Sequence, residues 1–278
     1  MEPYRTELVN GLKTRVVDTG GDKPTLVLIH GLANAIQIWD GILPRLAQRF
    51  RVIAFDLPGF GEADRPVAAY DSAFFADQLR AVLDTLAIDR AHLVGSSLGA
   101  GVIVRFSDRN LDRIDRAVLA APGGFGRETH PLMRFPALPL VGDWLGRPTP
   151  ANNRITLNLA IHDPRNVTPE LVEWVNRYAR EPGSDLSFVR TLQTGVGLFG
   201  VRDRAGFEAL ARRFQRPALV VWGRQDRVFP AHHSDRAVAL LPMSERILLD
   251  QCGHYPHWEQ PGAFAAAVER FLLEGAGT

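Results

Sequence analysis

Short apolar runs that alternate with helix-like stretches constrain the fold of this chain more than any other feature. Continuous apolar runs of strand length are typical of strands that are buried on both faces. These runs lie at 25–29, 52–55, 91–94, 116–120, 218–222 and 246–249, with helix-like stretches between them at 71–87, 98–108, 231–241 and 261–273. This alternation predicts an α/β fold with a mostly parallel, doubly wound sheet and right-handed crossovers.

The alternation of strands and helices is preceded by a predicted antiparallel hairpin and is interrupted once by a long segment. Two strand-like stretches separated by Asn10-Gly11 predict a hairpin over residues 4–9 and 12–18. Between about 123 and 214 no buried strand is evident, and several helical patterns follow a stretch rich in proline and aromatic residues. We therefore predict one core domain, formed by residues 1–122 and 215–278, into which a helical cap of residues 123–214 is inserted.

Composition narrows the classes of partner. The chain has 278 residues, a net charge of +1 and no basic stripe, which argues against nucleic acid as a partner. The single Cys252 cannot form an intramolecular disulfide and suits a reducing compartment. No apolar run approaches the roughly 20 residues that span a bilayer, and the N-terminus lacks a signal-peptide core. We expect a cytoplasmic protein with no membrane partner, and the sequence leaves monomer and homodimer open.

One motif indicates chemistry at the end of the third parallel strand. Gly95-Ser96-Ser97-Leu98-Gly99 matches the G-x-S-x-G pattern, in which a serine occupies a sharp turn from a strand into a helix. The apolar residues before the motif and the helical pattern after it supply the context that the motif requires. The central position selects Ser97 as the nucleophile, and Ser96 is only its neighbour.

A serine nucleophile needs a base and an acid that orients the base. Among the eight histidines, His254 alone follows the last apolar strand closely, and its competitor His257 is expected at a helix start or on the surface. Asp226 follows another strand, whereas Asp250 is expected at a strand end. The order serine, acid, histidine then favours Ser97, Asp226 and His254.

Backbone N–H groups should stabilise the oxyanion of the tetrahedral intermediate. One donor is expected at Leu98, directly after the nucleophile. The other is expected at Leu32, or failing that Ala33, in the loop after residues 25–29. We interpret His30 as a structural residue that supports this loop.

Taken together, these motifs resemble the capped α/β-hydrolases, which include carboxylesterases and the carbon–carbon hydrolases that act on ring-cleavage products. The resemblance rests on His30-Gly31, on DLPGFGEADRP at 56–66, on the motif around Ser97, and on Asp226 and His254. It implies the roles given above and no cofactor. A serine at the centre of the motif differs from the aspartate of haloalkane dehalogenases and epoxide hydrolases.

Two features bear on the substrate. The segments VVWGRQDRV and CGHYPHWEQP resemble the carbon–carbon hydrolases, but Leu-Ala-Asn-Ala after His30-Gly31 departs from their glycine- and proline-rich run. Those enzymes also need a cation to bind a substrate carboxylate. Arg190 could supply it, but we expect this residue on the surface of a helix.

The sequence therefore predicts hydrolysis of small carboxylic esters, with carbon–carbon hydrolysis, lactone hydrolysis and a slow-turnover receptor as alternatives. The residues expected to line the substrate pocket, or to pack the cap onto the core, are Phe125, Met133, Phe135, Trp144 and Tyr255.

Two further patterns are set aside. GVGLFG at 195–200 matches a dinucleotide-binding pattern, but it follows no predicted strand and lacks the acidic residue about 20 positions on. His232-His233 lies near Asp235 without a matching carboxylate pair and is expected in a solvated loop. We therefore predict no metal site.

Overall fold

A single mixed sheet forms the centre of the protein. The computed structural model describes residues 4–134, 137–138, 142 and 148–273. The sheet has the order β1-β2-β4-β3-β5-β6-β9-β10 and is parallel except where β2 pairs with β1 and β4. Its strands are β1 Tyr4–Val9, β2 Leu12–Asp18, β3 Thr25–Ile29, β4 Arg51–Phe55, β5 Ala91–Ser96, β6 Ile114–Ala120, β9 Ala218–Gly223 and β10 Ser244–Leu249. The predicted mostly parallel sheet is confirmed, and so is the hairpin that precedes it.

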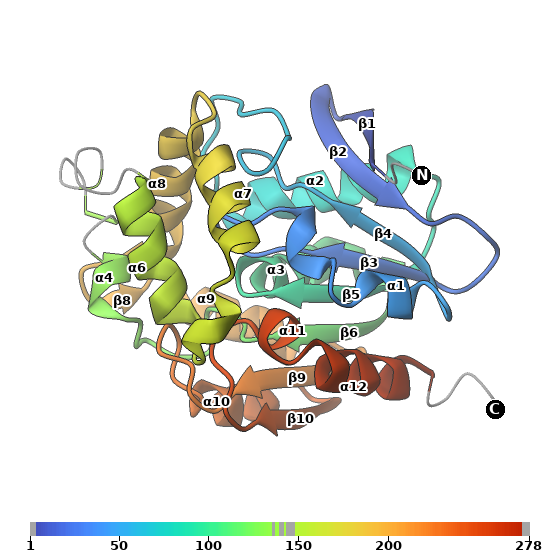
Figure 1. The fold of residues 1–278 in the computed structure, drawn as a ribbon. Helices are drawn as coiled ribbons and strands as arrows, with labels where there is room; N and C mark the ends of the chain where they lie inside the picture. The colour runs from blue at the N-terminus through green and yellow to red at the C-terminus, as the bar shows by residue number, and fades with distance from the viewer. Residues whose placement is uncertain (1–3, 135–136, 139–141, 143–147, 274–278) are drawn as a thin grey trace.

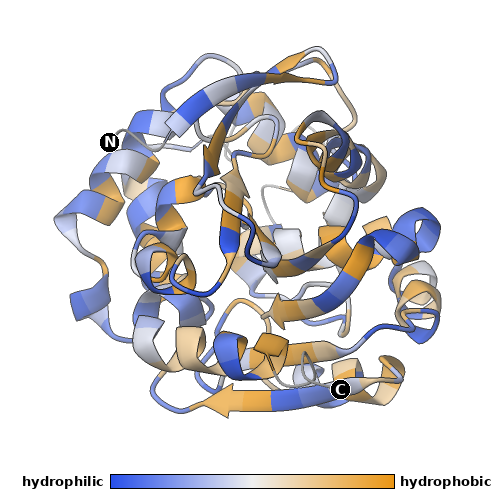
Figure 2. Cartoon of the chain, turned by 90° about the vertical axis from the view of Figure 1, so that its right-hand side faces the viewer, coloured by the Kyte–Doolittle hydropathy of each residue, from blue (hydrophilic) through white to orange (hydrophobic). Residues whose placement is uncertain are grey.

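The apolar runs of the sequence form strands, and the side chains of most of these strands are buried on both faces of the sheet. Every residue of β9 is buried, and β3 and β4 are buried from their second residue onward. Figure 2 shows hydrophobic colour along the central strands and hydrophilic colour on the outward sides of many helices. Two apolar clusters, one on each face of the sheet, form the core.

Helices cover both faces of the sheet. α2 shows how the sequence specifies them: Asp71 accepts a hydrogen bond from the Phe74 N–H at 2.8 Å and caps the helix, whose apolar side then packs into one core cluster. The helices of the core are α1 Leu43–Leu46, α2 Ser72–Thr85, α3 Leu98–Asn110, α10 His233–Leu240, α11 Pro256–Glu259 and α12 Pro261–Leu273, with short 3₁₀ turns at Ile36–Trp39 and Leu111–Arg113. A third 3₁₀ turn, Pro164–Asn166, lies in the segment between β6 and β9.

The segment between β6 and β9 gathers mainly at one end of the sheet. Figure 1 shows its green and yellow helices beyond the ends of the strands, on the left of the view. They are α4 Pro131–Arg134, α6 Pro150–Ala160, α7 Pro169–Ala179 and α8 Ser184–Gly195. α9, Arg204–Arg212, differs because it packs against α3 and α10 of the core. In the described residues, no helix is both long enough and apolar enough to cross a bilayer.

GVGLFG is a small hairpin in the structure. Val196–Gly197 and Gly200–Val201 form the antiparallel strands β7 and β8. The sequence pattern missed them because two-residue strands leave no periodic signal. The glycines serve the tight turn, since Gly200 has a φ of +103°.

Candidate active site

Ser97 occupies a strained turn between β5 and α3. Its φ is +51°, a value that non-glycine residues rarely adopt, and its hydroxyl-bearing side chain lines a pocket. The flanking glycines allow this turn. A Cβ on Gly95 would lie 2.5 Å from the Ala100 nitrogen, and a Cβ on Gly99 would lie 2.1 Å from the Ile29 oxygen.

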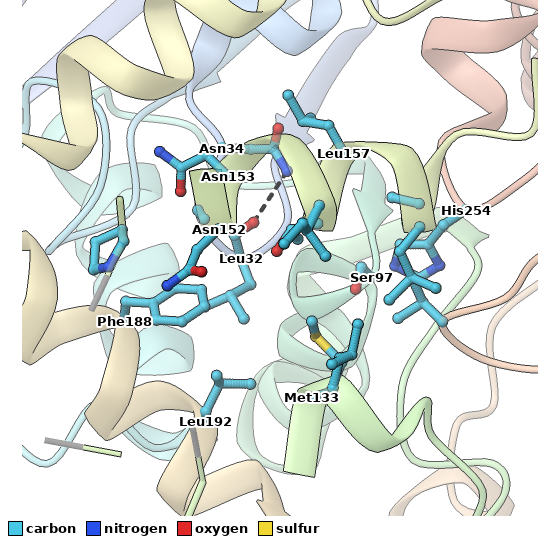
Figure 3. Close-up of a pocket in the computed structure, with 18 of the residues that line it drawn as sticks. Leu32, Asn34, Ser97, Met133, Asn152, Asn153, Leu157, Phe188, Leu192 and His254 are labelled. Carbon is cyan, nitrogen blue, oxygen red and sulfur yellow. Dashed lines mark hydrogen bonds between the residues drawn. The ribbon is translucent and has the colours of Figure 1, made fainter. Parts of the chain in front are cut away.

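His254 and Asp226 form a buried pair beside the same pocket. Asp226 Oδ2 lies 2.8 Å from His254 Nδ1, and the two side chains are 0% and 4% exposed. The other oxygen, Oδ1, accepts the backbone N–H groups of Val228 and Phe229 at 2.8 and 3.0 Å. An ionised carboxylate only accepts hydrogen bonds, so Nδ1 carries the proton and Nε2 is left as the basic nitrogen. Figure 3 shows the His254 ring next to Ser97.

The loop that carries His254 is tied to the end of α6. The His254 N–H donates to the Ala160 carbonyl at 2.6 Å. Glu259 accepts the N–H of Gly253 at 2.8 Å through one oxygen and that of His162 at 2.7 Å through the other. Burial raises the pKa of this carboxyl, although the backbone donors oppose the shift. The position of His254 therefore depends on the helical segment as well as on the core.

The loop after β3 brings a second group of backbone atoms to Ser97. Leu32 lines the pocket, and Ala33 has a φ of +56°. Asn34 fixes this turn, because its amide donates to the Leu32 carbonyl and to the Tyr255 hydroxyl, each at 3.1 Å. Figure 3 shows the Asn34 side chain at the edge of the pocket. Leu98 begins α3, and the first N–H groups of a helix have no partner within it. The two proposed donors thus come from neighbouring turns at the ends of β3 and β5.

His30 supports this loop from below, in agreement with its structural interpretation. Its Nε2 accepts the Leu57 N–H at 2.9 Å, and its Nδ1 lies 2.8 Å from the Gly31 oxygen. Complete burial lowers the pKa of the imidazole, so the ring is neutral and its Nδ1 carries the proton. It lines none of the cavities around Ser97.

A buried ion pair that the sequence reasoning missed anchors the same region. Arg15 Nε lies 2.8 Å from Asp56 Oδ2, and Asp56 also accepts the Ile36 N–H at 2.8 Å. Arg15 donates to the Tyr178 hydroxyl of α7 at 3.0 Å, and so connects the hairpin, the loop after β3 and the helical segment. The DLPGFG motif, which begins at Asp56, was the available signal.

The pocket that contains Ser97 and His254 is mainly apolar. It has a volume of about 250 Å³, and its described lining contains no lysine or arginine. Figure 3 shows the side chains of Met133, Phe188 and Leu192 around it, with the amides of Asn152 and Asn153. Its polar contacts are therefore hydroxyl, amide and imidazole groups.

The residues expected to line the substrate pocket divide into three groups. Met133 and Tyr255 do line it. Phe125 does not: it is 1% exposed and packs edge to face on Phe207 at 5.1 Å, which corrects that expectation. Phe135 and Trp144 lie outside the described residues.

The alternative candidates for the acid, the nucleophile and the base lie outside the pocket that Ser97 lines. Asp250 is exposed and pairs with Arg224, and the Ser96 side chain is buried beside the turn. His257 lies in the first turn of α11, as the expectation of a helix start has it, but it is only 1% exposed, so the alternative of a surface position is wrong. Its ring lies 4.4 Å from that of Trp39, and burial lowers its pKa to about 3. Such a ring is neutral and has no route to substrate.

The histidine pair differs from the solvated loop that we expected. His233 is buried, and its Nε2 lies 2.7 Å from Glu128 Oε2, while His232 Nε2 lies 3.8 Å from the same oxygen. Glu128 comes from the loop after β6, 104 residues before His232, so sequence proximity could not reveal it. Since Glu128 and His232 are exposed, we assign no role to this cluster.

Comparisons with known proteins agree with this architecture. A 2-hydroxy-6-oxononadienedioate/2-hydroxy-6-oxononatrienedioate hydrolase of Paraburkholderia phymatum is 32% identical over 278 residues, covering 97% of this chain and 94% of the relative. The solved structure of a meta-cleavage product hydrolase from Pseudomonas fluorescens is 28% identical, with a TM-score of 0.82 and 97% of each chain covered. A solved carboxylesterase structure from Bacillus subtilis shares the fold. It is 23% identical with a TM-score of 0.76, and the match covers 98% of this chain and 92% of the carboxylesterase chain. A family model described as the alpha/beta hydrolase fold matches residues 24–261. The chain therefore belongs to the α/β-hydrolase family.

Proposed function

We propose that this protein is a serine hydrolase that cleaves small, largely apolar carboxylic esters through an acyl-enzyme. The observation that carries the proposal is the 2.8 Å contact between His254 Nδ1 and Asp226 Oδ2, at a pocket that Ser97 also lines. This arrangement leaves the imidazole Nε2 free to act as a base beside a serine on a strained turn.

Each step then uses groups of this chain alone. Ser97 Oγ attacks the ester carbonyl while His254 Nε2 takes its proton, and Asp226 stabilises the resulting imidazolium. The carbonyl oxygen becomes an oxyanion that accepts the N–H groups of Leu32 and Leu98. His254 returns the proton to the departing alkoxide, which leaves as the alcohol. Water, deprotonated by the same imidazole, then attacks the acyl carbonyl, and the acid departs as His254 returns the proton to Ser97 Oγ. This scheme requires no metal or cofactor.

The pocket favours uncharged groups next to the scissile bond. Carboxylates are costly to bury without a cationic partner. The described lining of the first pocket offers no such partner, and Arg190 is exposed and donates to Gln193 at 3.3 Å. Esters meet this constraint because they are neutral and carry a good leaving group.

Carbon–carbon hydrolysis is the second candidate, because the relative from Paraburkholderia phymatum is named for it. The same serine and histidine would serve either reaction. Parallel assays with p-nitrophenyl butyrate and a ring-cleavage dienoate separate the two. A clear preference for the dienoate in kcat/KM would replace the ester proposal.

The helical segment is proposed as a cap over this pocket. Met133 on α4, Leu157 on α6 and Phe188 on α8 all line the cavity. Because α9 packs on core helices, we place the end of the cap near residue 202 rather than 214. A cytoplasmic location and a monomer or homodimer remain predictions.

The decisive experiment compares the two adjacent serines. Ser97→Ala should abolish both ester turnover and labelling by a fluorophosphonate, because the attacking oxygen is lost. Ser96→Ala should retain most of both, and serves as the matched control. Labelling that persists in Ser97→Ala would place the nucleophile elsewhere. Parent protein that labels but releases only about one equivalent of product would support the receptor alternative.

A further inference from the structure

A second cavity is also lined by Ser97. It has a volume of about 390 Å³ and shares Ser97, Leu32, Leu192, Val196 and Phe229 with the pocket described above. The two cavities are therefore two arms of one site that meet at the proposed nucleophile. The second arm follows α3 away from Ser97 and is closed by residues of α2, α8 and α9.

The two arms differ in charge. Among described residues, the first arm is lined by no arginine or lysine, whereas the second is lined by Arg105 and Arg202. Arg105 lies on α3, eight positions after Ser97. Eight residues make about two helical turns, so the two residues lie on one face of the helix with backbones about 12 Å apart. Gly101 occupies the turn between them and lines the cavity without a side chain. Helical side chains lean toward the N-terminus of their helix, which for Arg105 is the end that carries Ser97.

The charge of Arg105 is not neutralised by a direct contact. The side chain is half-buried, and within the described ranges it makes no hydrogen bond and no ion pair. Arg202 is exposed and donates its Nε to the Val196 carbonyl at 2.9 Å. The two carboxylates that line the cavity cap helices: Asp71 accepts the Phe74 N–H, and Asp203 accepts the Gly206 N–H.

From this arrangement we infer that the second arm binds an anionic end of the substrate, with Arg105 as its main partner. The substrate class is a half-ester of a dicarboxylic acid: the ester carbonyl lies at Ser97, the acyl chain follows α3, and its terminal carboxylate meets the guanidinium. A planar guanidinium matches a carboxylate with two parallel hydrogen bonds. This inference rests on the proposed ester hydrolysis and specifies its substrate.

The test compares p-nitrophenyl half-esters of adipic and suberic acid with the same esters whose far carboxylate is capped as the methyl ester. The quantity measured is the ratio of kcat/KM for the charged and the capped ester within each variant, which cancels any loss of folded protein. The parent ratio should exceed the Arg105→Met ratio by about five- to tenfold, the range of a partly solvated, charge-assisted contact. Arg105→Lys should keep an intermediate ratio, because it retains the charge without the planar fork.

Arg109→Met is the matched control, because Arg109 is an exposed arginine in the last turn of the same helix and lies outside the cavity. It should leave the ratio unchanged. If both esters are hydrolysed but Arg105→Met has the parent ratio, the inference is wrong while the proposed function stands. If neither ester is hydrolysed and Ser97 is not labelled by a fluorophosphonate, the proposed function itself fails.

Discussion

Gly99→Ala tests the geometry on which Ser97 depends. An alanine Cβ at this position would lie 2.1 Å from the Ile29 carbonyl oxygen and 2.7 Å from that of His30. Both atoms belong to the backbone at the end of β3, and Ile29 is completely buried, so neither can rotate away as a side chain would. Overpacking a core typically costs 1–3 kcal/mol and sometimes more. Because backbone must move here, we expect a loss of about 3 kcal/mol or more in the free energy of unfolding.

Gly101→Ala is the matched control. It makes the same chemical change two residues later in α3, but the nearest atoms to its added Cβ are 3.9 and 4.0 Å away. Alanine is favoured over glycine within a helix by about 1 kcal/mol. The control should therefore be equally stable or slightly more stable than the parent.

Urea denaturation followed by tryptophan fluorescence measures both stabilities, and the rate of fluorophosphonate labelling reports on Ser97. Gly99→Ala should lose stability and label slowly, because α3 must move away from β3 and would displace Ser97 at its start. A Gly99→Ala protein within about 1 kcal/mol of Gly101→Ala, with the parent labelling rate, would refute the close-approach argument.

Two other predictions concern stability. The lowered pKa of His257 means that the folded protein disfavours its protonated form, so stability is retained above the unfolded pKa of about 6.5 and falls as the pH drops below it, by roughly 2 kcal/mol at pH 5. His257→Phe should therefore flatten the pH dependence of urea unfolding between about pH 7.5 and pH 5, and parallel curves for the two proteins would contradict the assignment. Arg15→Met should cost about 3–5 kcal/mol in the same assay, because it leaves the buried Asp56 carboxylate without its cation. Arg90→Met, which breaks the solvated pair with Asp115, should cost at most about 1 kcal/mol, and equal losses in both variants would overturn this reasoning.

Local patterns in the sequence predicted the features that local geometry determines. The buried runs became strands because side chains on both faces of a parallel strand must be apolar. The position of Ser97 followed from two glycines at a fixed spacing, and each glycine proves to lie where a Cβ has no room. The pairing of Asp226 with His254 was predictable because both follow parallel strands, whose carboxyl ends lie at one edge of a sheet.

Contacts between distant segments were not predictable in the same way. Arg15 and Tyr178 are 163 positions apart, and no periodicity relates a hairpin residue to a helix in the inserted segment. Phe125 was expected in the pocket as an apolar residue of the predicted cap, but its ring packs on Phe207, which lies 82 positions later in the chain. The buried position of His257 likewise depends on packing against Trp39, which precedes it by 218 residues.

The contrast between His254 and His257 shows what decides the role of a histidine here. The two rings are three residues apart and are both buried. His254 faces a carboxylate that can stabilise an imidazolium, and its ring lines the pocket with Ser97. His257 is packed among aromatic rings, and in the described structure neither of its nitrogens has a hydrogen-bond partner. Protonation of the His257 ring is disfavoured, because burial lowers its pKa and no partner for a positive charge lies beside it. The feature that distinguishes His254 from His257 is therefore its contact with the carboxylate of Asp226, which comes from a loop 28 residues earlier in the chain.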